Sequence, residues 1–300
     1  MSRETEKVFR ELKKYLGDKE FDSEEDFEKA VQEFMNMFNT GLDEPEKKEK
    51  DAWDYLDMAY ESDNEEDALK YAKKALMLDK NCLDADVMIA ELTTETNEEL
   101  KRKYEKLIVK AEKHLKEEKV WADENIGIFW GIHETRPYMR LRYSYMHLLL
   151  SMGKYRKAIK ECEDLLVLSE NDNLGVRYTL ISLYSFFEDE TNAMKLYDKF
   201  DKEASAHMLL PIIALYYKLD NYKKAETYLK KLSEVNDGLE EFFCNYGTGD
   251  LLDDPEVEKA INLGMYRPGS KEELVIAVMD SIFLYKTNEG FLSWISEYYS

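Results

Sequence analysis

A pattern of small and large apolar residues recurs along this chain and constrains its fold more than any other feature. The anchor alanines of three successive copies are Ala158, Ala193 and Ala225, which are separated by 35 and 32 residues. An earlier copy contains Trp53, Leu56, Ala59, Tyr60, Ala68, Ala72, Ala75 and Leu78. A period of about 34 residues is typical of stacked helix pairs, because one pair cannot bury its apolar face alone.

The pattern predicts five helix pairs. They are 51–62 with 65–79, 82–92 with 97–118, 136–151 with 154–168, 173–187 with 190–201, and 205–219 with 222–235. Only 12 Gly and 5 Pro occur in 300 residues, which favours helices with short connections over an all-β fold. Pro211 lies inside a predicted helix, so that helix either starts near His207 or is kinked.

Further helices are predicted on both sides of the array, at 3–16 and 23–40 and then at 238–246, 255–263, 270–286 and 289–299. Ser270 and Glu273 have the spacing of a capping box at the start of the third of the later helices. We therefore expect an N-terminal helical cap over 1–50, the array over 51–236 and a C-terminal helical cap over 237–300. The alternative for residues 232–300, which carry a net charge of −10, is that they fold over the array.

An irregular excursion is predicted at 117–135, because this connection is too long for an ordinary turn between helices. Trp121, Phe129 and Trp130 make it apolar for a loop, so we expect it to be ordered and packed against the array.

The repeat resembles the tetratricopeptide repeat. Family positions are matched by Trp53, Leu56, Tyr60, Ala68, Ala72, Ala75 and Asp79, and again by Tyr145, Met146, Leu149, Gly153, Tyr155, Ala158 and Leu165. Lys80 stands where the family has proline, and Arg142 and Arg177 replace an early aromatic residue. The segment 129–140 resembles a bacterial subgroup of such proteins. The resemblance implies an all-α right-handed superhelix of antiparallel pairs, whose concave face, lined mainly by first helices, receives a peptide or a partner helix.

Composition excludes several kinds of function. The net charge of −22 argues against binding to free nucleic acid. The longest apolar run, 208–217, is shorter than the roughly 20 residues that span a bilayer, and the N-terminus has no apolar signal region. Cys82, Cys162 and Cys244 are too far apart for a disulfide framework or a metal site, so we expect a reducing, cytoplasmic location.

A run of cations interrupts this acidic chain. Residues 135–160 contain seven Lys and Arg and no Asp or Glu. From the family register we predict a binding site on the first helices, made of Arg136, Arg140, Tyr143, His147, Tyr178, Ser182 and His207. Arginine binds carboxylates in bidentate fashion, so the expected partner is a protein or peptide segment that is acidic or ends in a carboxylate. The alternative, that acidic neighbours neutralise the run internally, is equally open.

No catalytic residue, metal or cofactor is predicted, and we do not expect an enzyme. His133, Glu134 and Arg136 resemble a catalytic cluster, but polar residues that pin an irregular loop explain them better. Two alternatives to a protein-interaction scaffold remain. One is a small-molecule or phosphate site, enzymatic or not, at 117–140, and the other is a self-associating scaffold.

Overall fold

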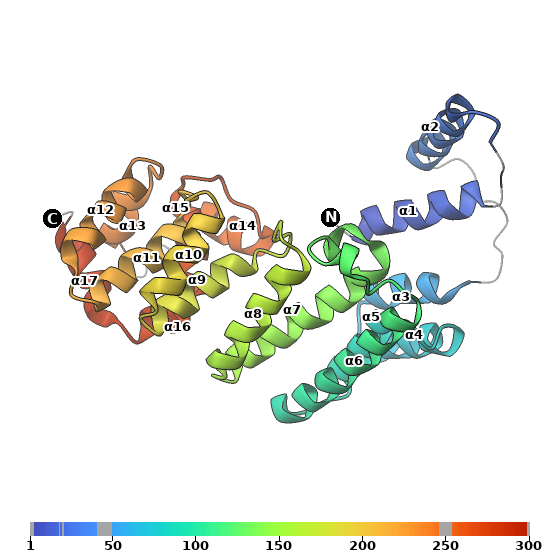
Figure 1. The fold of residues 1–300 in the computed structure, drawn as a ribbon, viewed down its shortest axis with the longest axis horizontal. Coiled ribbons are helices and arrows are strands. Elements are labelled where there is room, and N and C mark those ends of the chain that lie inside the picture. Colours follow the sequence, from blue (N-terminus) through green and yellow to red (C-terminus); the bar gives the residue numbers. More distant parts are fainter. Residues whose placement is uncertain (1–2, 18, 20, 41–49, 246–253, 299–300) are drawn as a thin grey trace. The chain divides into compact units, whose positions relative to one another are not determined.

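The computed structural model describes residues 3–17, 19, 21–40, 50–245 and 254–298, which contain seventeen α-helices and no named strand (Figure 1). The first six helices are α1 (Arg3–Leu16), α2 (Glu24–Thr40), α3 (Ala52–Tyr60), α4 (Glu65–Leu78), α5 (Leu83–Leu92) and α6 (Asn97–Glu117). The next six are α7 (Arg136–Ser151), α8 (Tyr155–Leu168), α9 (Val176–Phe186), α10 (Glu190–Lys199), α11 (Ala206–Lys218) and α12 (Tyr222–Ser233). The last five are α13 (Leu239–Asn245), α14 (Pro255–Leu263), α15 (Lys271–Asp280), α16 (Ile282–Lys286) and α17 (Glu289–Tyr298). The predicted all-α fold and all five helix pairs are confirmed.

The chain divides into two compact units. Unit 1 comprises Met1–Glu118 and Gly131–Pro137, and unit 2 comprises Lys119–Trp130 and Tyr138–Ser300. The boundary falls inside the predicted array, so α7 begins in unit 1 and continues in unit 2.

Unit 1 contains the pairs α3–α4 and α5–α6. Ala72 and Ala75 of α4 are completely buried, because a methyl side chain lets neighbouring helices approach closely. Asp51 starts α3 with a capping box that includes Asp54, which satisfies backbone donors at the helix start. Arg10 of α1 forms an ion pair with Asp57 of α3 at 2.9 Å, so the N-terminal helix is attached to the first pair.

Unit 2 contains the pairs α7–α8, α9–α10 and α11–α12. Its three anchor alanines, Ala158, Ala193 and Ala225, are all completely buried. Cys162 of α8 is completely buried as well and lies against Met146 of α7, as expected for a small apolar core residue. Unit 2 therefore stacks its pairs through the positions that the repeat pattern identified.

Residues 119–130, part of the predicted excursion, pack through a cluster of aromatic rings. Trp121 meets the rings of Phe129 and Tyr138 edge to face, with centroid distances of 5.1 and 5.3 Å. Phe129 is completely buried, and the amide of Glu170 donates to the carbonyl of Gly127 at 2.8 Å. The excursion is thus a packed part of unit 2 that also reaches the end of α8.

Helix α11 is enclosed by its neighbours. Every residue from Ala206 to Tyr216 is buried, because α9, α12 and α15 pack around the helix. The helix starts one residue before His207 and accommodates Pro211 in its interior.

The prediction of one continuous helix over 270–286 is wrong, since the structure has α15 and α16 instead. Ser281 lies between them with φ −122° and ψ 28°, outside helical geometry, and its hydroxyl shares a hydrogen bond of 2.7 Å with Ser182 of α9. This break lets α15 pack on α11 while α16 packs on α9.

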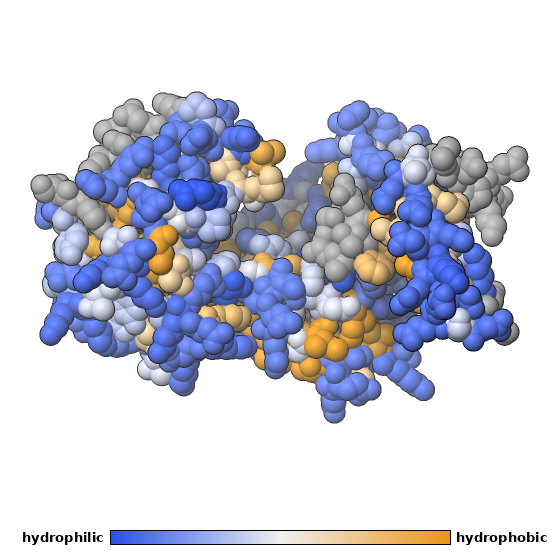
Figure 2. Space-filling model, turned by 90° about the horizontal axis from the view of Figure 1, so that it is seen from above, coloured by the Kyte–Doolittle hydropathy of each residue, from blue (hydrophilic) through white to orange (hydrophobic). Residues whose placement is uncertain are grey.

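Hydrophilic residues cover most of the molecular face drawn in Figure 2, in keeping with the net charge of −22. Among the residues that the structure describes, none of the helices combines the length and the apolar character needed to cross a membrane.

Candidate functional site

The seven predicted site residues lie on the first helices of three successive pairs. Arg136, Arg140, Tyr143 and His147 are on α7, Tyr178 and Ser182 on α9, and His207 on α11. Arg136 belongs to unit 1, whereas the other six belong to unit 2. We call the surface formed by α7, α9 and α11 within unit 2 the first-helix face.

Arg136 is buried and paired within unit 1. Its side chain is 3% exposed, and its Nη1 lies 3.4 Å from Oε1 of Glu6 on α1. Nearby, the ring of His133 packs on Phe9 with a centroid distance of 5.1 Å, and burial together with the charge of Arg136 lowers the pKa of His133. Arg136 thus joins α1 to the start of α7 instead of facing solvent.

Arg142, the next arginine but one on α7, is also neutralised internally. It donates to the hydroxyl of Tyr138 at 2.7 Å and to carboxylates of Glu161 and Asp164 on α8, the latter at 3.0 Å. Burial raises the pKa of Glu161, and the charge of Arg142 partly offsets that effect. For Arg136 and Arg142, therefore, the alternative of internal neutralisation holds.

Tyr143 and His147 form an exposed aromatic pair on α7. Their centroids are 4.5 Å apart in an edge-to-face arrangement, with His147 exposed and Tyr143 partly buried. Arg140 precedes them by one turn and is partly buried. Burial, and next the negative charge of Asp280, raise the pKa of Tyr143. Burial lowers the pKa of His147, and the charge of Asp280 partly offsets that effect.

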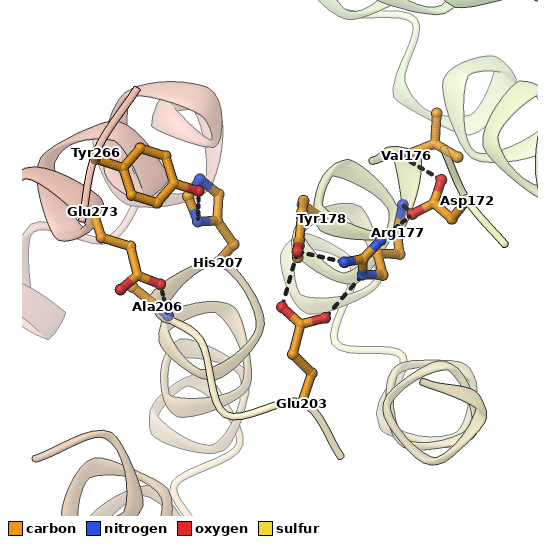
Figure 3. Close-up of polar contacts among 9 residues, drawn as sticks. All are labelled: Asp172, Val176, Arg177, Tyr178, Glu203, Ala206, His207, Tyr266 and Glu273. Carbon is orange, nitrogen blue, oxygen red and sulfur yellow. Dashed lines mark hydrogen bonds and ion pairs between the residues drawn. The ribbon is translucent and has the colours of Figure 1, made fainter. Parts of the chain in front are cut away.

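Tyr178 and His207 come together beneath the C-terminal helices. Their ring centroids are 5.0 Å apart, and the other face of His207 stacks on Tyr266 at 5.6 Å with an interplanar angle of 20°. The Tyr266 hydroxyl lies 3.5 Å from Nδ1 of His207 (Figure 3). Nε2 of the same ring lies 3.4 Å from Oδ2 of Asp280. His207 is 6% exposed, so this ring is enclosed.

A network around Arg177 fixes Tyr178. Arg177 donates to Asp172 at 2.9 Å and to Glu203 at 3.0 Å, and the Tyr178 hydroxyl donates to the other oxygen of Glu203 at 2.8 Å (Figure 3). Asp172 also accepts the backbone amides of Val176 and Arg177, which caps α9. Burial and the bond to Glu203 raise the pKa of Tyr178. Burial alone would raise the pKa of Glu203, but hydroxyl hydrogen bonds and the charge of Arg177 outweigh it and lower that pKa.

Neither this network nor its acidic members could be predicted from the repeat pattern. The available signal was the presence of Arg177 at a position where the resembled family has an aromatic residue. Arg142 occupies the corresponding place in the preceding pair and has the same kind of partners, a tyrosine and two carboxylates.

The C-terminal helices cover the first-helix face over α9 and α11. Oε1 of Glu273 accepts the amide of Ala206, the first residue of α11, at 2.8 Å, and its other oxygen accepts the amide of Gly269 at 2.6 Å. Ser182 is completely buried beneath Ser281, and Phe283 packs on Tyr155 and Phe186 at 5.2 and 5.9 Å.

Residues 255–298 therefore pack on α9 and α11. The predicted capping box is incomplete. Ser270 accepts the amide of Glu273, but the Glu273 carboxylate is directed to Ala206 and Gly269 instead of the Ser270 amide. Of the predicted site, Tyr143 and His147 stay accessible, whereas Ser182 and His207 lie under the chain's own helices.

The described residues offer neither a metal cluster nor a reactive cysteine. They contain no group of three His, Cys, Asp or Glu side chains placed to hold a metal ion. Cys82 and Cys162 are buried, and burial raises the pKa of Cys82 to about 11 and that of Cys162 further, which keeps both thiols protonated at neutral pH. The side chain of Cys244 lies outside the described part.

These features define an all-α protein built from stacked antiparallel helix pairs, whose repeat resembles the tetratricopeptide repeat. No protein-family model matches the sequence, and no curated protein matches it. Among solved structures, the chain is similar to one described as "Crystal structure of MamA protein", with a TM-score of 0.43 and 15% identity over 61% of this chain and 90% of that chain. At that TM-score the likeness carries no functional inference, and the assignment of the class rests on the helix pairs themselves.

Proposed function

We propose that this protein is a protein-interaction scaffold that binds a partner segment on the α7 part of its first-helix face. The supporting observation is the Tyr143–His147 pair on α7, a first helix of unit 2, where His147 is exposed and Tyr143 is partly buried. Aromatic side chains of this kind combine apolar contact area with a polar donor or acceptor, which suits them to interfaces.

The chemistry of the partner follows from the charges around this pair. An acidic or carboxylate-terminated segment was the expectation from sequence, but Arg136 and Arg142 already have carboxylate partners. Asp280, 62% exposed in its side chain, adds a negative charge beside Tyr143 and His147. We therefore propose that the partner binds mainly through apolar and hydrogen-bonding groups, with an acidic partner as the second choice.

The test is affinity capture from lysate with the intact chain and a Tyr143→Ser/His147→Ser variant. The matched control is Val167→Ser, because Val167 is 59% exposed on α8 of the same unit and lies away from the first helices. Loss of one captured protein with the double variant alone supports the proposal. An unchanged set of captured proteins contradicts it.

Salt dependence separates the two kinds of partner. Exposed charge pairs are screened beyond about 8 Å at physiological ionic strength. Capture that survives fivefold higher salt (about 0.75 M) indicates apolar and hydrogen-bonded recognition, whereas steep loss indicates an acidic partner.

The two alternatives have less support. A ligand at 117–140 would have to displace Glu6 from Arg136, and Trp121, Phe129 and Tyr138 already pack against one another there. Self-association is tested by light scattering across protein concentration, in which a mass that stays that of one chain counts against it.

A further inference from the structure

The hairpin of α1 and α2 in unit 1 leaves part of an apolar stripe uncovered. Phe27, Val31, Phe34 and Phe38 follow one another at spacings of four, three and four residues, so they share one face of α2. Phe34, in the middle, is 7% exposed and packs on Tyr15 of α1 at a centroid distance of 5.6 Å.

The two ends of this stripe stay accessible. Phe27 is 42% exposed and Phe38 is 43% exposed, and Met37 beside the stripe is 39% exposed. Helix α1 packs on α2 and covers the centre of the stripe, and the ring of Phe21 meets that of Phe27 edge to face at a centroid distance of 5.4 Å. Several large apolar side chains exposed on one helix mark an interaction surface, whereas single ones are common on any protein.

Charge indicates what fits this surface. Helix α2 carries five acidic residues and one lysine, a net charge of −4, and the lysine, Lys29, pairs with Glu25 at 3.2 Å. Three of the acids form its first turn, namely Glu24, Glu25 and Asp26. A second copy of this chain would bring the same acidic flank and the same −22 charge, so like charges would oppose that contact. The acidic residues of α2 would repel an anionic membrane surface as well.

We propose that the apolar stripe of α2 binds an amphipathic helix of another protein, with basic residues flanking its apolar face. The partner's apolar side chains cover Phe27 and Phe38, and its Lys or Arg residues lie beside the acidic first turn of α2. This contact uses helix-on-helix packing with complementary charge, and it is separate from the proposed α7 site.

The experiment uses two synthetic peptides of about 14 residues, four helical turns, with identical leucine positions. One peptide carries lysine at its polar positions and the other carries glutamate. Each is labelled and titrated with the full chain, and binding is followed by fluorescence anisotropy. We expect the lysine peptide to bind at least tenfold more tightly than the glutamate peptide.

The decisive variant is Phe27→Ser/Phe38→Ser, with Met77→Ser as the matched control, because Met77 is 81% exposed on α4 of the same unit. We expect the double variant to weaken lysine-peptide binding at least tenfold and the control to leave it unchanged. A second variant, Glu24→Gln/Glu28→Gln, keeps the stripe and should weaken binding at low salt only.

Equal binding of the lysine peptide to the intact chain and to the double variant overturns the proposal, as does equal binding of both peptides. Light scattering provides the remaining outcome. A dimer that disappears in Phe27→Ser/Phe38→Ser identifies a second copy as the occupant and also overturns the proposal. Circular dichroism of each variant checks that its helices are retained.

Discussion

Arg142 and Arg177 show how single residues alter a repeat. Each stands where the resembled family has an early aromatic residue, and each donates to one tyrosine and two carboxylates. Their charge therefore ties first helices to acidic neighbours. A buried arginine whose partners are all satisfied is tolerated, whereas a carboxylate left without its cation is strongly destabilising.

Replacing Arg142 with methionine should lower the free energy of unfolding of unit 2 by about 3 kcal/mol, because Glu161, whose side chain is 15% exposed, would lose its cation. Chemical denaturation measures this change. Arg156→Met is the control, since Arg156 is exposed and lies over Phe187 at 4.7 Å, so its loss should cost less than about 1 kcal/mol. Equal effects of the two substitutions would contradict the role assigned to Arg142.

Glu203 should make the protein sensitive to acid. Its pKa in the folded state is lowered from the ordinary 4.5, so the unfolded chain takes up this proton first as pH falls. The stability that Glu203 contributes is therefore present above about pH 4.5 and is lost as pH falls below that value towards the folded-state pKa.

The Glu203→Gln variant should be less stable than the intact chain at neutral pH and should lose less stability between about pH 5 and pH 3. Denaturant unfolding at a series of pH values measures how the free energy of unfolding of each protein changes with pH. If the free energy of unfolding changed equally with pH in the two proteins, the Arg177–Glu203 contact would not be maintained in solution.

At the scale of elements, the helices could be predicted from local pattern because their determinants are local. Ala72, Ala158, Ala193 and Ala225 are each completely buried where helices cross. Small residues that recur at the period of the repeat can be recognised from the sequence alone. The bounds of α1, α7 and α14 agree with the prediction to the residue.

The environment of the candidate site could not be predicted from local sequence pattern. Glu6 is 130 residues from Arg136, and Glu273 is 67 residues from Ala206. Which carboxylate meets which donor is decided by tertiary packing, and a sequence with 64 acidic residues offers many candidates. That Tyr143 and His147 share one face of α7 follows from their spacing of four residues.

Glu273 joins two helices that are distant in the chain, and removing its carboxylate should destabilise unit 2. The Glu273→Ala variant leaves the buried amide of Ala206 without its acceptor, which should cost about 1–3 kcal/mol. Glu272→Ala, the neighbouring change in the same first turn of α15, should stay within about 0.5 kcal/mol of the intact chain. Amide hydrogen exchange at Ala206 should speed up only in the Glu273 variant, and unaltered exchange there would contradict the contact.

For the whole molecule, two compact units imply that unfolding is not a single two-state event. Calorimetry should show two transitions. Arg142→Met should lower only the one that belongs to unit 2, and Ala72→Leu should lower only the other, because Ala72 has no room for added carbons in the core of unit 1. One transition that both substitutions shift together would show that the units unfold as one.

The burial of α11 depends in part on residues that the ribosome adds later in synthesis. Helix α15 is one of the helices that enclose α11, and Phe291 and Ile295 of α17 are completely buried as well. The side of Ala206 to Tyr216 that faces α15 is therefore synthesised well before the residues that cover it, and it stays exposed until they are made. Early termination after α12 would leave that side of α11 uncovered, and we expect chaperones and proteases to recognise it.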